Sequence, residues 1–194
     1  DFDDIAGTYI APAGTFAVLD WVNHQDFELS FKDGSAWYFS GSSMMRTKST
    51  DRNGNAVLYH YDLDNSLTGV TDPGGRDYAL LYDAGGRLTT VTDVGGRSVL
   101  YEYDTANDLL TRVTAPSGAY TDYSYYPSGD PQYKLYTRTY SGMTGENLVN
   151  YYDSDGRVTR QTLGAGDFNL ANDAENMVTQ TDRDGNRQIF FFTE

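Results

Sequence analysis

The residues whose types and spacing most suggest chemistry are aspartates and asparagines placed two positions apart. Residues 182–186 follow an Asp-x-Asp-x-Asn pattern, and residues 153–155 repeat half of it. Oxygen ligands at this spacing are typical of calcium loops, which also need a glycine at the sixth position and a bidentate acid at the twelfth. In both segments the glycine comes fourth, and the twelfth residue is Thr193 or Gly164. Because tight turns use the same residue types, we interpret both segments as turns and expect no cofactor, with a structural calcium ion as the alternative.

Groups for nucleophilic or acid–base catalysis form no recognisable constellation. His24 and His60 lie far apart, and neither accompanies a serine motif of the kind that marks a catalytic triad. Acidic residues recur at a regular spacing along the chain, whereas a catalytic carboxylate pair should be singular. We therefore expect no catalytic residue and no enzyme, and a carbohydrate-active enzyme or an autoprotease is the least favoured alternative.

Aromatic side chains are the remaining candidates for binding. Trp21, Trp37 and some of the 17 tyrosines would stack on sugar rings if they lie exposed on a flat surface. The competing interpretation, which we favour, is that the aromatic residues form a packing ladder along one face of a β-sheet.

Composition excludes several classes of protein. The 194 residues include 28 acidic and 14 basic side chains, for a formal net charge of −14, which argues against a nucleic-acid partner. There is no cysteine for a disulfide or a thiolate metal site, and no apolar run long enough for a transmembrane helix. The chain starts without methionine and ends on the apolar residues 189–192, from which we expect a piece of a larger architecture.

A periodic motif explains the many tyrosines and the 20 glycines. Tyr-Asp pairs begin at positions 61, 82 and 103, which are 21 residues apart, and another pair begins at 152. Self-similarity at such a period indicates a repeat architecture. The regularity divides the chain into an N-terminal β-hairpin segment (1–50), regular 21-residue repeats (51–126) and an irregular continuation with further repeats (127–194).

Each repeat predicts two strands and two turns. Residues 98–104 alternate, so that Val99, Tyr101 and Tyr103 share one face. Residues 105–108 form a turn, and the Thr- and Val-rich segment 109–114 forms a second strand. Short connections favour an antiparallel meander, because parallel crossovers need a dozen or more residues. Only residues 169–177 offer a helical window, and it is short, so the predicted fold class is all-β.

The motif resembles the RHS repeat, also called the YD repeat. Residues 82–88 (Tyr-Asp-Ala-Gly-Gly-Arg-Leu), 91–93 (Val-Thr-Asp) and 96–97 (Gly-Arg) are close to the family consensus, and residues 152–158 are another copy. The resemblance implies that the hairpins join into a curved or spiralling sheet, a partial β-shell. In bacterial members, such shells enclose a toxic domain. The paired Asp-Pro-x-Gly motifs of the family's autoproteolytic cap are absent from this sequence, so no proteolytic residue is carried over.

The repeat residues are the predicted structural determinants: tyrosines as the packing ladder, and aspartates, glycines and arginines in the turns. Their members are Tyr61, Asp62, Tyr82, Asp83, Gly86, Arg87, Tyr103, Asp104, Tyr152, Asp153, Gly156 and Arg157. The arginines at 76, 87, 97 and 157 are expected to bridge to acids between neighbouring turns.

Two functions of different class follow. The first is a non-catalytic segment of a secreted or cell-surface RHS protein, whose partners are the rest of its parent chain or an enclosed toxin domain. The second is an extracellular adhesive or self-assembling protein, which would bind glycans through Trp21 and Trp37 or pair with like copies through its sheet edges. Neither function involves nucleic acid or a membrane span.

Overall fold

The chain is built from strands and turns, as the sequence predicts. The computed structural model describes residues 2–3, 8–9, 14, 16–22, 25–127, 133–145, 147–174 and 177–191. No helix that is long and apolar enough to cross a bilayer occurs among these residues. The segment 169–177, the only helical window in the sequence, contributes to two strands, β17 and β18.

The strands are short, and most of them are rich in Thr, Val and Tyr, which favour extended backbone. β1 (Phe2–Asp3) and β2 (Thr8–Tyr9) form a small separate pair. The others are β3 (Ala17–Val22), β4 (Asp26–Phe31), β5 (Ala36–Ser40), β6 (Arg46–Thr50), β7 (Ala56–Tyr61), β8 (Leu67–Thr71), β9 (Asp77–Tyr82), β10 (Leu88–Thr92), β11 (Ser98–Asp104), β12 (Leu109–Thr114), β13 (Tyr120–Tyr125), β14 (Leu135–Tyr140), β15 (Leu148–Tyr152), β16 (Val158–Leu163), β17 (Gly166–Ala174), β18 (Met177–Thr181) and β19 (Arg187–Phe191).

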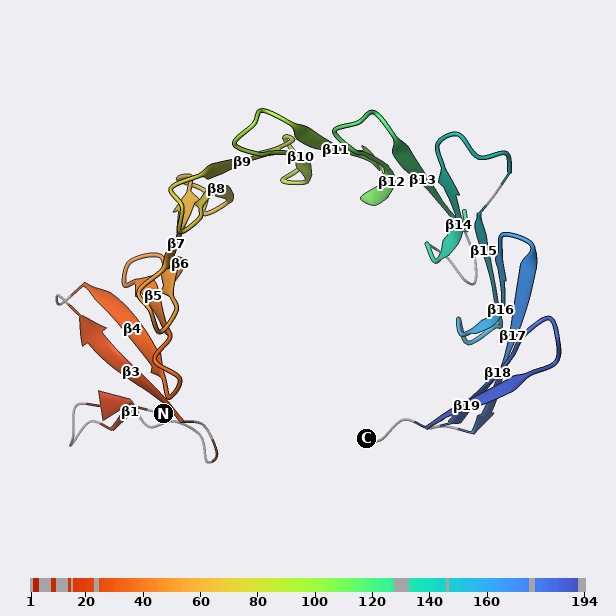
Figure 1. Cartoon of the computed structure of the whole chain (residues 1–194), viewed down its shortest axis with the longest axis horizontal. Coiled ribbons are helices and arrows are strands. Elements are labelled where there is room, and N and C mark those ends of the chain that lie inside the picture. The colour runs from red at the N-terminus through yellow and green to blue at the C-terminus, as the bar shows by residue number, and fades with distance from the viewer. Residues whose placement is uncertain are drawn as a thin grey trace. The chain divides into compact units, whose positions relative to one another are not determined.

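The chain divides into two compact units, residues 1–98 and 99–194. In the first unit each strand from β3 to β10 pairs antiparallel with the next strand along the chain (Figure 1). In the second unit the strands from β11 to β19 do the same. The predicted antiparallel meander is therefore confirmed. The three-segment division by repeat regularity stays a prediction.

A β-bulge interrupts the ladder at one end of most two-strand repeats. Between β7 and β8, His60 pairs with Gly69 and Tyr61 with Leu67, so Thr68 is an extra residue. Equivalent register shifts leave one extra residue in β6, β10, β12, β14 and β16. Because a bulge bends its strand and increases the local twist, the bend recurs with the repeat.

Little of either unit is deeply buried. No described side chain is fully enclosed, and the buried apolar residues are only Phe27, Ala36, Leu148 and Val149. Stable domains usually pack two layers of secondary structure around a core. Here the described strands of each unit form a single layer, so one face of the sheet keeps half-exposed apolar side chains.

Candidate functional site: the aromatic face of the sheet

The two faces of the sheet differ in chemistry, and one of them is mainly apolar. We call it the aromatic face and define it by the strand positions that lie on the same side as Tyr61 and Tyr82; the opposite side is the polar face. In the first unit its larger apolar members are Leu19, Trp21, Phe27, Leu29, Phe31, Trp37, Phe39, Val57, Tyr59, Tyr61, Leu67, Val70, Tyr78, Leu80, Tyr82, Leu88 and Val91.

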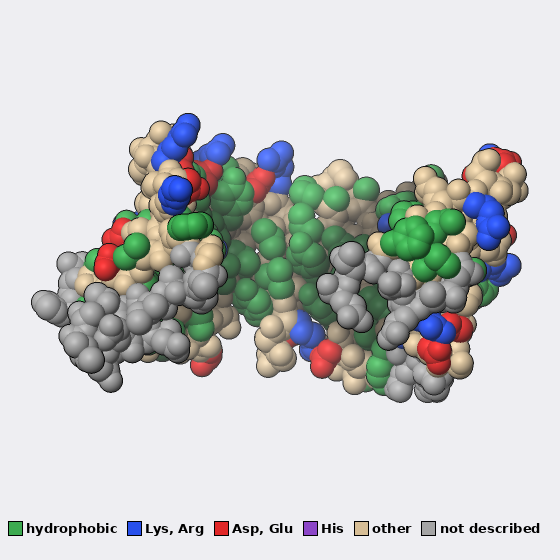
Figure 2. Space-filling model, turned by 90° about the horizontal axis from the view of Figure 1, so that it is seen from below, with side chains coloured by type: hydrophobic (Ala, Val, Ile, Leu, Met, Phe, Trp, Pro, Cys, Tyr) green, Lys and Arg blue, Asp and Glu red, His purple; other side chains and the backbone are tan. Residues whose placement is uncertain are grey.

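The polar face of the same strands carries most of their charge. Its acidic members in the first unit are Asp20, Asp26, Glu28 and Asp77. Figure 2 shows hydrophobic side chains gathered over the middle of the sheet, with charged side chains towards the ends of the strands. The aromatic face is therefore the surface most suited to contact with an apolar partner.

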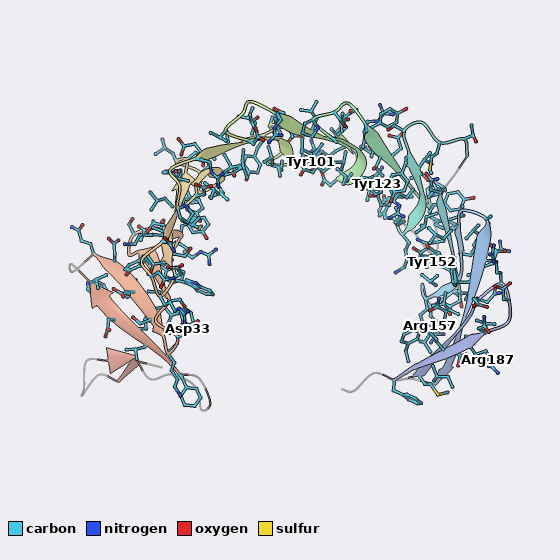
Figure 3. All side chains as sticks on the ribbon, viewed as in Figure 1. Asp33, Tyr101, Tyr123, Tyr152, Arg157 and Arg187 are labelled. Carbon is cyan, nitrogen blue, oxygen red and sulfur yellow. The ribbon has the colours of Figure 1, made fainter. Side chains whose placement is uncertain are left out.

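The second unit shows the same pattern, and its aromatic face is the side of its strands from which Tyr101, Tyr123 and Tyr152 project (Figure 3). The rings of Tyr126 and Tyr136 lie 4.7 Å apart, and those of Tyr126 and Tyr152 lie 5.7 Å apart, edge to face. Aromatic pairs of this geometry contribute about 0.5–1.5 kcal/mol beyond their buried area.

The hydroxyl of the repeat tyrosine has a specific partner, the carbonyl oxygen that precedes a bulge. Tyr61 donates to the carbonyl of Arg46 at 3.0 Å, and Tyr82 donates to the carbonyl of Leu67 at 2.9 Å. Tyr125 and Tyr152 make the same bond, with Leu110 and Leu135 as acceptors. Each hydroxyl therefore satisfies a carbonyl at the point where the ladder is disturbed, while the ring of the same tyrosine lies on the aromatic face.

A second recurrent residue, the threonine at the bulge, was not predicted from the sequence. Its hydroxyl donates back to a carbonyl of the preceding strand, as Thr68 does to His60 at 3.3 Å and Thr89 to Leu81 at 3.1 Å. Thr47, Thr111 and Thr159 make the same bond. The signal was present in the sequence, because positions 47, 68 and 89 are 21 residues apart.

Removing either hydroxyl at one bulge is expected to weaken the first unit. Tyr82→Phe and Thr68→Val should each lower the free energy of unfolding by about 1 kcal/mol, the usual net value of one hydrogen bond. For a chain of this length that is a fall of about 2–4 °C in Tm, measurable by thermal unfolding followed by circular dichroism.

Tyr78→Phe is the matched control for this pair. Tyr78 lies on the same strand and face as Tyr82, and its hydroxyl has no hydrogen-bond partner in the described part of the chain. Its replacement should leave Tm unchanged. Equal losses for Tyr78→Phe and Tyr82→Phe would contradict a specific role for the bond to Leu67.

Aspartate organises most of the turns through the same set of hydrogen bonds. In the turn of residues 83–87, Asp83 Oδ1 accepts from the amides of Gly85 and Arg87, at 2.8 and 3.0 Å. Its Oδ2 accepts from Arg87 Nε at 2.8 Å. Turns headed by Asp72, Asp93 and Asp153 repeat this arrangement with their own arginines. Those headed by Asp51 and Asp182 place asparagine where the arginine stands.

Bridges from the arginines to acids between neighbouring turns stay a prediction. Within their own turns, Arg76, Arg87, Arg97 and Arg157 each pair with the aspartate four residues earlier. The cause is local. The backbone amides of the turn donate to Oδ1 of the aspartate, and the turn places the arginine guanidinium beside Oδ2 of the same carboxylate. Among the other predicted turn residues, Asp62 accepts from the amides of Asp64 and Ser66, and Asp104 accepts from Ala106 and Asn107.

The fourth residue of most turns adopts a left-handed backbone, whereas in the turn headed by Asp104 it is the fifth residue, Asp108. Gly86 and Gly156 have φ of 78° and 74°, and Asn65 takes the same role with φ of 62°. Glycine and asparagine tolerate this region best, which explains their recurrence at this point of the repeat.

These hydrogen bonds hold the turn carboxylates in their charged form. The backbone amide and then the side chain of Arg87 lower the pKa of Asp83 below its ordinary value of 3.8. The amide of Arg157 is the largest cause of the lowered pKa of Asp153. The pKa is lowered likewise for Asp33, Asp51, Asp72, Asp93, Asp104 and Asp182.

Stability is therefore expected to fall in acid. A carboxyl whose pKa is lower in the folded chain stabilises it above the unfolded pKa, and that contribution is lost as pH falls through the folded pKa. We expect the free energy of unfolding in urea to decline steadily below about pH 4. Asp83→Asn should reduce stability at pH 7 and flatten part of this decline. If the free energy of unfolding of Asp83→Asn declined in acid as much as that of the parent, the lowered pKa of Asp83 would be contradicted.

The two tryptophans are partly exposed on the aromatic face. Trp21 is 55% exposed and stacks edge-on against Phe27, with ring centroids 4.6 Å apart. Trp37 is 38% exposed and stacks in the same way against Phe31. Both tryptophans pack within the aromatic ladder, and both also leave part of the ring exposed to a ligand. Stacking of these rings on sugars stays a prediction.

The possible metal and catalytic residues lie in turns or on the polar face. Asp182 uses both carboxylate oxygens within its own turn, and the described residues hold no group of three potential metal ligands. His60 Nε2 lies 2.9 Å from Thr71 Oγ1, which donates its proton to Asp77 at 2.7 Å. Because a nucleophilic hydroxyl must donate to its histidine, this geometry does not activate Thr71. His24 lies outside the described residues.

Comparison with known proteins identifies the repeat. Residues 82–118 match the model of the family described as RHS Repeat. This segment contains the Tyr82-Asp83 turn, β10 to β12 and the bulges at Thr89 and Thr111. No curated protein sequence matches the chain.

Solved structures with the same fold are toxin-complex chains. The Tc holotoxin pore of Photorhabdus luminescens, with a mutation in TccC3, aligns with a TM-score of 0.59 and 12% identity over 85% of this chain. The crystal structure of TcdB2-TccC3-Cdc42 aligns with a TM-score of 0.59 and 15% identity over 86%. That of TcdB2-TccC3-TEV covers 96% at 11% identity, with a TM-score of 0.55. The match spans only 11%, 10% and 13% of those chains, respectively.

Proposed function

We propose that this RHS-repeat chain is a structural segment of a β-shell that encloses or presents another polypeptide domain. The observation that carries the proposal is the aromatic face, which in each unit covers one side of a single-layer sheet whose described residues bury almost no core. A half-exposed apolar face of this length calls for a covering partner. The toxin-complex fold supports a shell, because the chain aligns with about a tenth of those much larger chains.

The partners follow from the same argument. The rest of a longer parent chain would extend the meander, and the enclosed domain would lie against the aromatic face. A secreted or cell-surface location is proposed because the similar structures belong to toxin complexes.

The test is the structure of the full-length gene product. We expect cryo-electron microscopy to show a hollow shell with density for a second domain inside it. The enclosed domain should resist proteases until the shell is opened with denaturant. A filament or an open solenoid, with every domain equally sensitive to protease, would overturn the proposal.

A second function is favoured by the exposure of the tryptophans. An extracellular protein that binds glycans would use Trp21 and Trp37 as stacking platforms, since more than a third of each side chain is exposed. Glycan-array binding that disappears in Trp21→Ala and Trp37→Ala, and persists in Tyr78→Phe, would favour this function over the shell.

We propose a non-catalytic function that needs no cofactor. The turn hydrogen bonds occupy the carboxylates that would otherwise bind a cation, as at Asp182. Exhaustive dialysis against EDTA is expected to leave Tm unchanged. A fall in Tm that added calcium restores would establish a structural cation and contradict this prediction.

A further inference from the structure

Among the described strand residues, one charged side chain lies on the aromatic face of each unit, and in both units it is an arginine. Arg46 pairs in register with Phe39, and Arg138 pairs with Tyr123 and Leu148. The described side chains of β3 to β19 place no carboxylate on this face. Acids are not scarce, since the chain has 28 of them.

Arg46 is held by aromatic rings alone. Its guanidinium carbon lies 5.0 Å from the ring centroid of Trp37 and 4.5 Å from that of Tyr59. No carboxylate contacts it among the described residues. Such a contact fixes the position of the guanidinium but leaves its N–H donors free for another acceptor.

Arg138 is in a similar environment in the second unit. Its guanidinium carbon lies 4.9 Å from the ring centroid of Tyr140. Its Nε atom is buried and has no hydrogen-bond partner in the described part of the chain. Buried donors are almost always paired in folded proteins, so this one indicates a missing acceptor.

Arg112, which lies on the polar face, is paired differently. Arg112 forms two hydrogen bonds with Asp122, at 2.6 and 2.9 Å, while it stacks over Tyr120. A polypeptide that covers the aromatic face would remove water from Arg46 and Arg138. A covered cation without a counter-charge is strongly unfavourable, so the covering segment must itself supply the anion.

An apolar pocket lies next to Arg46. Leu19, Phe27, Leu29, Phe39 and Met44 line a volume of about 390 Å³, within the range of small ligand sites. Phe39 is the register partner of Arg46, and Leu29 is the register partner of Trp37. The first unit thus combines a pocket for a large apolar side chain with a fixed guanidinium beside it.

We propose that Arg46 and Arg138 each bind a carboxylate of the polypeptide that covers the aromatic face of their own unit. The occupant is an extended segment in which an acidic residue stands two positions from a large apolar one. Extended backbone directs every second side chain towards the sheet, so both side chains then face Arg46 and the apolar pocket beside it. This inference rests on the proposed function, and it adds that the enclosed polypeptide is recognised by charge as well as by apolar contact.

The test uses three fluorescein-labelled 12-residue peptides and the 194-residue chain. The first peptide repeats Phe-Ser-Glu-Ser, so that phenylalanine and glutamate share one face of an extended chain. The second peptide replaces each glutamate with glutamine, and the third replaces it with lysine. Fluorescence anisotropy is expected to show about tenfold tighter binding of the glutamate peptide than of the glutamine peptide. The double variant, Arg46→Met with Arg138→Met, should reduce that preference at least threefold without a change in Tm.

Arg160→Met is the matched control. Arg160 stacks over Tyr151 at 3.8 Å, but it lies on the polar face, so its loss should leave the preference unchanged. Equal binding of the glutamate and glutamine peptides would overturn the carboxylate site and leave the shell untouched. An open filament in microscopy, with the glutamate preference intact, would overturn the shell and keep the site. Self-association of the chain through this face, with no peptide bound, would make a second copy the occupant and overturn the proposal.

Discussion

Gly41→Ala is expected to destabilise the first unit by about 2–3 kcal/mol, through overpacking against backbone. A Cβ atom at Gly41 would overlap the backbone carbonyl oxygen of Gln25, where β4 and β5 meet at one end. The amide of Gly41 also donates to Asp26 Oδ1 at 3.2 Å, so the two segments cannot separate without losing that bond. Thermal unfolding should show a fall in Tm of about 5–10 °C.

Gly69→Ala is the matched control, because it also adds a methyl group to a glycine within the sheet. Its Cβ would make only ordinary contacts, with the Tyr78 carbonyl oxygen at 3.4 Å and the His60 side chain at 3.5 Å. We expect a Tm at or slightly above that of the parent, because alanine restricts the unfolded chain more than glycine does. A similar loss in both variants would show that a general glycine effect, and not the approach of Gln25, is responsible.

Asn150→Ala is expected to cost about 1–3 kcal/mol in the second unit. Asn150 is only 5% exposed, and its amide nitrogen donates to the carbonyl of Leu135 at 3.1 Å. Its side-chain oxygen accepts from Gln161 Nε2 at 2.8 Å. Truncation removes both bonds and leaves the amide of Gln161 without its acceptor in a partly buried position.

A double-mutant cycle in urea separates the pair from its surroundings. Gln161→Leu alone should also destabilise the chain, because it leaves the oxygen of Asn150 unpaired. The double variant, Asn150→Ala with Gln161→Leu, should lose less than the sum of the two, with a coupling energy of about 0.5–3 kcal/mol. Strict additivity would show that the two amides do not depend on each other.

The elements and turns of the repeat could be predicted because local chemistry determines them. The alternation of Val99, Tyr101 and Tyr103 places them on one face, as the register with β12 confirms. Aspartate and glycine at fixed offsets determine the turns, since each turn satisfies its own hydrogen bonds.

The bulges could not be predicted because a bulge breaks the strict alternation of side chains from which the two faces of a strand are predicted. Leu67 and Val70 lie on the same face although they are three residues apart, since Thr68 is an extra residue in β8. Alternation alone would assign them to opposite faces. The role of Arg46 was hidden for the same reason, because its face depends on the bulge at Thr47.

The bulge also determines where the repeat can change its length. Tyr61 and Tyr82 each reach a carbonyl 15 residues earlier, and Tyr125 does the same. The loop that follows each tyrosine in the sequence varies in length. Five residues separate Tyr82 from its register partner Leu88, whereas nine separate Tyr125 from its register partner Leu135. The repeat can therefore take a longer loop after a repeat tyrosine, because the next bulge restores the phase of the ladder. A protein built in this way can acquire new loops along one margin of its sheet without altering the pairing of any strand.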